Sequence, residues 1–169
     1  MTGNTQAERS VPQPVRLMGL DYGSVTVGVA VTDELGITAI PLETVTRKKE
    51  NHLRQTLKRI AELAEAHRTE LIVLGRPVHM DGSAGERVAM AENFRTMLAG
   101  RIDVPIIWQD ERLTTVEADE ILVGSGIPKA DRKKYLDSVA ASVILRDYMN
   151  MTESICMNQA AEEKNGREG

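Results

Sequence analysis

The sequence predicts one α/β domain built on a mixed sheet of five strands with helices on both faces. Three short apolar segments near the start are separated by tight turns, which indicates an antiparallel meander. Apolar segments then alternate with segments of helical periodicity, which indicates β-α units. A length of 169 residues accommodates one domain with tails, because two domains would each lack a sufficient core.

Five segments have the apolar or β-branched composition of strands. Turn residues 22–24 separate the first two, and turn residues 33–36 separate the second from the third. The run Leu71-Ile72-Val73-Leu74 is apolar throughout, as in a strand that is covered on both faces. The predicted strands are 16–21, 25–31, 37–45, 70–75 and 104–108.

Four segments are predicted to be helices. Apolar residues recur at helical spacing in the first. Ser83 with Glu86, and Thr114 with Glu117, match the spacing of capping boxes and open the second and third. The predicted helices are 51–67, 83–98, 114–123 and 131–149. The expected order is therefore β-β-β-α-β-α-β-α-α.

Composition limits the classes of function. Residues 1–14 and 151–169 are polar, so we expect an N-terminal and a C-terminal tail around a domain at 15–150. The net charge of −4 gives no bulk argument for nucleic-acid binding, and five scattered aromatic residues do not suggest a base-stacking platform. No apolar run approaches the roughly 18 residues of a membrane span, so we expect no membrane partner. The single Cys156 is consistent with a reducing, cytoplasmic setting.

Acidic residues stand at three places where chemistry is expected. Asp21 ends one predicted strand, and Asp110 and Glu111 follow another. Acids at the strand ends of an α/β sheet face the crevice where ligands bind. The pleat lets only one of Asp110 and Glu111 face it, and spacing alone does not choose between them.

Asp137 is the third such residue, and it lies inside the last predicted helix. It shares a helix face with Ala140, Ala141 and Ile144, and the two alanines would let that face lie close to the sheet. A carboxylate on a buried face needs a partner or a metal ion. Carboxylate oxygens are the ligands that hard divalent cations prefer, and such ions can activate water against a phosphodiester.

Four segments resemble the signatures of the YqgF/RuvX family, in order and at domain-scale spacing. They are residues 18–24 (MGLDYGS), 75–83 (GRPVHMDGS), 110–115 (DERLTT) and 137–141 (DSVAA). The resemblance spans about residues 15–150. It implies a ribonuclease-H-like fold and a nuclease related to Holliday junction resolvases, implicated in maturing the 5′ end of pre-16S rRNA. The second signature departs from the family pattern at Arg76 and His79.

The resemblance also implies the site. By position, Asp21, Glu111 and Asp137 match the proposed catalytic carboxylates, which would hold Mg²⁺ or Mn²⁺. Seven further residues are candidates for substrate contacts because they lie in the family's loops or in the basic run before Asp137. They are Arg76, His79, Asp81, Arg112, Thr114, Lys133 and Lys134.

The leading hypothesis is a metal-dependent nuclease that cuts structured RNA, with a ribosomal RNA precursor as its partner. A resolvase that cuts branched DNA, and a non-catalytic module that binds nucleic acid or an assembly factor, are the alternatives. An actin-like ATPase also begins with a loop like residues 21–24, but this chain is too short for the two domains that such an enzyme needs. The oligomeric state stays open.

Overall fold

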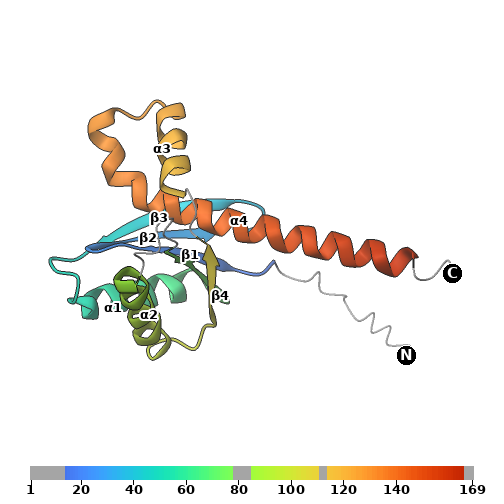
Figure 1. Ribbon diagram of the computed structural model, residues 1–169, viewed down its shortest axis with the longest axis horizontal. Helices are drawn as coiled ribbons and strands as arrows, with labels where there is room; N and C mark the ends of the chain where they lie inside the picture. Colours follow the sequence, from blue (N-terminus) through green and yellow to red (C-terminus); the bar gives the residue numbers. More distant parts are fainter. Residues whose placement is uncertain (1–13, 78–84, 111–113, 166–169) are drawn as a thin grey trace, which may run out of the picture.

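The computed structural model describes residues 14–77, 85–110 and 114–165, and the element order in these ranges is the predicted one. Figure 1 shows a sheet with α1 and α2 on one side and α4 on the other. The strands are β1 (Leu17–Tyr22), β2 (Thr26–Thr32), β3 (Ala39–Thr46), β4 (Leu71–Arg76) and β5 (Ile106–Asp110). The helices are α1 (Leu53–Ala66), α2 (Gly85–Ala99), α3 (Thr114–Gly124) and α4 (Lys129–Asn165).

The five strands form one mixed sheet, as predicted, and their order in the sheet is β3-β2-β1-β4-β5. The first three strands are antiparallel, whereas β4 and β5 are parallel to β1 and to each other. The carboxyl ends of β1, β4 and β5 therefore meet at one edge of the sheet. The end of β3 lies there too, because Thr46 pairs with Thr26 at the start of β2. We call this the carboxyl edge.

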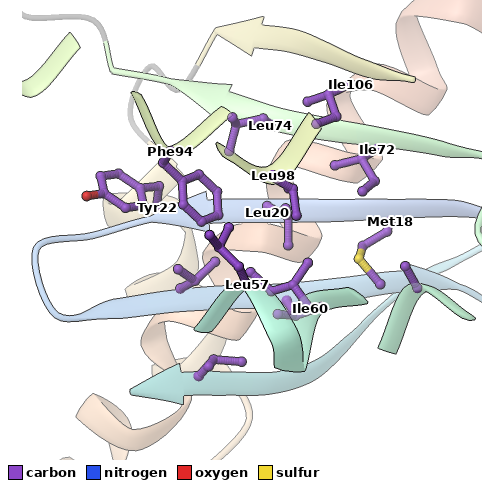
Figure 2. Close-up of a cluster of buried hydrophobic side chains, with 14 of the residues drawn as sticks. Met18, Leu20, Tyr22, Leu57, Ile60, Ile72, Leu74, Phe94, Leu98 and Ile106 are labelled. Atoms are coloured by element: carbon purple, nitrogen blue, oxygen red, sulfur yellow. The ribbon is translucent and has the colours of Figure 1, made fainter. Parts of the chain in front are cut away.

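The side chains of β1 alternate between the two faces of the sheet. Met18, Leu20 and Tyr22 point toward α1 and α2, and they belong to the main hydrophobic core. Figure 2 shows this cluster, in which the rings of Tyr22 and Phe94 stack with centroids 4.7 Å apart. Burial of these side chains fixes the register of β1, because a slip of one residue would exchange its two faces.

The opposite face of the sheet is covered by α4. Ala30 of β2 and Val73 of β4 are fully buried against Ala141, Ile144 and Leu145 of this helix. A third cluster joins α4 to α3 through four residues, which are Ala118, Leu122, Val139 and Ala140. One helix therefore connects the sheet to α3.

Two details of α4 differ from the predictions. The predicted end at Met149 is wrong, because the helix continues to Asn165 and extends beyond the sheet (Figure 1). Residues 129–165 contain no glycine or proline, so polar composition alone did not stop the helix. Ala140 was expected to face the sheet but packs against α3, and of the two alanines Ala141 is the one that lies close to the sheet.

The described part of the C-terminal segment, 151–165, is helical, and most of its side chains are exposed. No helix within the described residues combines the length and the apolar composition that crossing a bilayer requires.

Candidate functional site

The structure brings Asp21 and Asp137 to the same place at the carboxyl edge. Asp21 is the Cα partner of Gly28 in the antiparallel β1–β2 pair, so both residues point to the same face of the sheet. That is the face covered by α4, because Gly19, two residues before Asp21, lies against the Ala141 carbonyl. At Gly28 the backbone of α4 comes so close that a Cβ would overlap the carbonyl group of Asp137. Two predicted carboxylates therefore lie on neighbouring backbone segments.

Gly28 and Gly19 are determinants of this approach that the sequence reasoning missed. An ideal Cβ on Gly19 would stand 2.7 Å from the Ala141 carbonyl oxygen and 2.9 Å from Leu145 Cβ, closer than real Cβ atoms come. Glycine inside a strand often marks a close approach by another backbone. That signal was present in the sequence at both positions, since each lies within a predicted strand.

Burial distinguishes the two carboxylates. Asp21 is 9% exposed, between the buried side chains of Leu20 and Tyr22 in sequence. Asp137 is half-buried, in the part of α4 that passes over β2. A buried carboxylate needs a partner, a metal ion or several hydrogen bonds, whereas a half-buried one can also reach a bound substrate.

The structure also separates Asp110 from this pair. Ile106 and Trp108 pack with the core under α1 and α2, and Ile107 packs with the cluster under α4. Alternation therefore places Asp110 on the α1/α2 side of β5, away from Asp21. Arg76 is the Cα partner of Asp110, lies on that same side and is exposed.

Several predicted site residues fall outside the described residues. These are Glu111, His79, Asp81 and Arg112, together with the side chain of Thr114. Within the described residues, no three acidic, histidine or cysteine side chains gather as a metal site. The role of Glu111 thus stays a prediction.

Lys133 and Lys134 lie in the first two turns of α4, and both are exposed. Lys133 precedes Asp137 by four residues, so the two share one helix face. The ammonium group of Lys134 lies 5.6 Å from the ring centroid of Tyr135. Positive charge therefore stands one turn from Asp137.

Glu117 contacts the α3–α4 interface rather than only the start of its own helix. It was predicted to complete a capping box with Thr114, and its carboxylate forms an ion pair with Arg146 of α4. Burial raises the pKa of the neighbouring Asp147 carboxyl, partly offset by the charge of Arg146. The ion pair adds a polar link to the apolar cluster that packs α3 on the helix carrying Asp137.

One groove of the described surface lies apart from the carboxylates. A groove of about 640 Å³ runs between β3, α3 and α4, with Ile37, Ile121 and Tyr135 among its lining residues. Neither Asp21 nor Asp137 lines it. The two carboxylates lie instead at the carboxyl edge of the sheet.

The donor set fits a divalent cation. Asp21 and Asp137 offer oxygen ligands, which Mg²⁺ and Mn²⁺ prefer, and they come from two rigid elements whose backbones are in contact. Magnesium keeps several waters and commonly uses one or two carboxylates together with substrate phosphates. The residues present at the carboxyl edge are therefore sufficient to begin such a site.

Comparison with known proteins gives consistent matches. Residues 15–151 match the family model RuvX, described as Holliday junction resolvase. A protein of Lachnospira eligens named "Putative pre-16S rRNA nuclease" is 48% identical over 135 residues, which cover 80% of this chain and 96% of that protein. A protein of the same name from Agathobacter rectalis is 47% identical over 136 residues, covering 80% and 95%.

Among solved structures, RuvC of T. thermophilus in complex with a Holliday junction substrate is similar with a TM-score of 0.51. The match covers 81% of this chain and 96% of that one at 18% sequence identity, so it shows the fold alone. Together with the sheet topology, it confirms the predicted ribonuclease-H-like fold.

Proposed function

The chain belongs to the RuvX family of Holliday junction resolvases, and from this membership we propose that it is a divalent-metal-dependent nuclease acting on structured RNA. The substrate that we propose is a 16S rRNA precursor, because the relatives at 47–48% identity carry that substrate in their names; its 5′ region is the part that the family resemblance implies. The observation that carries the proposal is the pairing of Asp21 with Gly28 directly under the backbone of Asp137.

The proposed task of the three acidic residues is to bind the metal ion. Asp21, held in a buried strand, and Asp137, held on α4, would be metal ligands, with Glu111 as a third on the family pattern. When bound, Mg²⁺ or Mn²⁺ lowers the pKa of an attacking water and neutralises charge on the scissile phosphate. The rigid β1–α4 contact keeps the two carboxylates in place, so little reorganisation is needed when substrate arrives.

The basic residues of α4 would bring the substrate in. Lys133 and Lys134 are exposed one turn before Asp137 and would attract the phosphate backbone toward the carboxylates. Acids that converge as proposed here would repel a polyanion unless a cation bridges them, and this argues against a module that only binds nucleic acid. From the proposed rRNA precursor substrate we also propose a cytoplasmic location, since ribosomal RNA is processed there.

The test is cleavage of labelled 16S rRNA precursor with Mg²⁺, with Mn²⁺ and with chelator. We expect metal-dependent cutting by the wild type and at least about a hundredfold loss in Asp21→Asn and Asp137→Asn, since each removes a ligand charge. Asp147→Asn is the matched control, because it removes a carboxylate from the same helix ten residues further on. Undiminished cutting by Asp137→Asn would contradict the proposal.

A four-way DNA junction in parallel reactions decides between substrates. Cutting of the junction with the RNA left intact would show that this chain is a DNA resolvase, the activity described for its family model. Intact substrates in every reaction, with both bound by folded protein, would favour the binding module.

A further inference from the structure

Arg47, which follows β3, donates its side-chain hydrogen bonds to the backbone of the turn after Asp21. Its Nη2 donates to the carbonyl oxygens of Gly23 at 2.5 Å and Ser24 at 2.8 Å. Its Nε donates to the carbonyl oxygen of Glu50 at 3.1 Å. The guanidinium therefore joins two separate segments of the carboxyl edge.

The same guanidinium also contacts the side chain next to Asp21. Its carbon lies 5.0 Å from the ring centroid of Tyr22, within the range of a cation–π interaction. The Tyr22 ring stacks in turn on Phe94 of α2. Tyr22 is thus held by two contacts, and Asp21 lies between it and the buried Leu20.

Two backbone hydrogen bonds support the turn besides the Arg47 side chain. The Gly23 N–H donates to the Thr26 carbonyl at 2.7 Å, and the Arg47 backbone N–H donates to the Val25 carbonyl at 2.8 Å. Within the described residues, the carbonyl oxygens of Gly23 and Ser24 accept hydrogen bonds from the Arg47 side chain. Without that donor, two carbonyl dipoles would face solvent at the edge where phosphate is expected.

We propose that Arg47 is a positioning residue of the nuclease site, which fixes the 22–25 turn and thereby the backbone that aims the Asp21 carboxylate at the metal. The inference rests on the proposed function, since it assigns Asp21 the task of metal ligand. Arg47 acts through the turn and not through the substrate, because its Nε and Nη2 already donate to backbone oxygens of the protein, and its Nη1 is buried, although without a partner among the described residues.

The planar fork of arginine is what the arrangement requires. Nε and Nη2 reach three carbonyl oxygens at fixed angles, whereas a lysine ammonium on a flexible stem cannot reproduce this fork. Charge alone is therefore insufficient. This separates a positioning role from a phosphate contact, where a lysine would retain most of the effect.

The test compares Arg47→Lys and Arg47→Ala with the control Arg59→Lys. Arg59 also lies near β3, but it projects from the exposed side of α1 and forms an ion pair with Glu43 of β3. We expect both Arg47 variants to lower kcat and to weaken Mn²⁺ binding about 10- to 100-fold, as removing a partner of a metal ligand does. The KM for RNA and the salt dependence of RNA binding should stay as in the wild type.

Three results of these activity and binding measurements would overturn the inference. Normal activity in Arg47→Lys would show that charge and not the fork matters. A raised KM together with a shallower salt dependence, by about 0.7 per lost phosphate contact on a single strand, would show that Arg47 binds the substrate. Wild-type kcat and Mn²⁺ affinity in both variants would show that the turn does not position Asp21.

Hydrogen exchange keeps this test separate from the proposed function. In the free protein, the Gly23 amide should exchange faster in Arg47→Lys than in the wild type or in Arg59→Lys. If the wild type neither cuts RNA nor binds Mn²⁺, the proposed function fails, while this exchange rate still reports whether Arg47 holds the turn. Unchanged exchange at Gly23 would overturn the inference whatever the activity.

Discussion

Replacing Gly28 with alanine tests how closely α4 lies on the sheet. The new Cβ would overlap the Asp137 carbonyl group and stand 2.9 Å from the Ser138 nitrogen. These atoms are all backbone, so no side chain can rotate to relieve the overlap. Restoring an ordinary contact of 3.4 Å requires α4 to move by about 1.5 Å, which a close-packed interior resists.

The expected cost follows from that displacement. Overpacking of a well-packed core costs about 1–3 kcal/mol, and Gly28→Ala should lie at or above the upper end because backbone must move. For a chain of this size, 3 kcal/mol corresponds to a fall of roughly 6–12 °C in Tm. Gly19→Ala should cost less, since its Cβ would stand 2.7 Å from the nearest atom and a smaller movement relieves it.

Thermal unfolding of the variants measures these costs, and Gly85→Ala is the control. A Cβ at Gly85, the first residue of α2, meets none of the described residues within 4 Å, so that variant should match or slightly exceed the wild-type Tm. Cleavage gives a second readout, because a displacement of about 1 Å at a reacting group can cost a hundredfold in rate. A Tm for Gly28→Ala within about 1 °C of the wild type would refute the close approach of α4.

Further predictions concern packing and pH. Phe94→Ala should lower the free energy of unfolding by about 3–5 kcal/mol in urea titrations, because the ring is fully buried and stacks on Tyr22. The hydrogen bonds from Arg59 lower the pKa of Glu43, so the pair stabilises above the ordinary glutamate range and loses its effect as pH falls through the lowered value. Glu43→Gln should therefore cost less than about 1 kcal/mol at pH 7, and this cost should vanish as the pH falls below the lowered pKa of Glu43. Burial raises the pKa of Asp147, so its charged form opposes folding, and Asp147→Asn should raise Tm slightly at pH 7 but not below pH 3.

The order of the elements was predictable because each strand has its own local signal. Runs such as Leu71–Leu74 and the turn after Asp21 identify strands and their connections without reference to the rest of the chain. Strand ends shifted by one or two residues, because ladder hydrogen bonds continue past the apolar run, as at Asp110.

The site was only partly predictable, because it depends on contacts between distant segments. The resemblance led us to expect Asp21 and Asp137 to lie together. The close approach of their two backbone segments depends on Gly28, and this dependence can be recognised only once the β1–β2 register and the path of α4 are known. Arg47 carried no signal, since an arginine after a strand resembles any solvated basic residue. Its hydrogen bond to Gly23, 24 residues earlier in the chain, can be recognised only in the folded structure.

The alternation of β1 restricts how this strand can change its length. Deleting one residue before Asp21 would send the carboxylate among Leu57 and Phe94, and would turn Leu20 toward the α4 backbone. Inserting two residues would keep both faces but carry Asp21 about 6.6 Å along the strand, past its partner Gly28. A shift of one residue in β1 would thus remove both its core side chains and the Asp21 carboxylate from their places. The register that buries the core side chains of β1 also places Asp21 opposite Gly28. Once β1 has folded correctly, Asp21 is therefore in position, and no separate maturation step is needed.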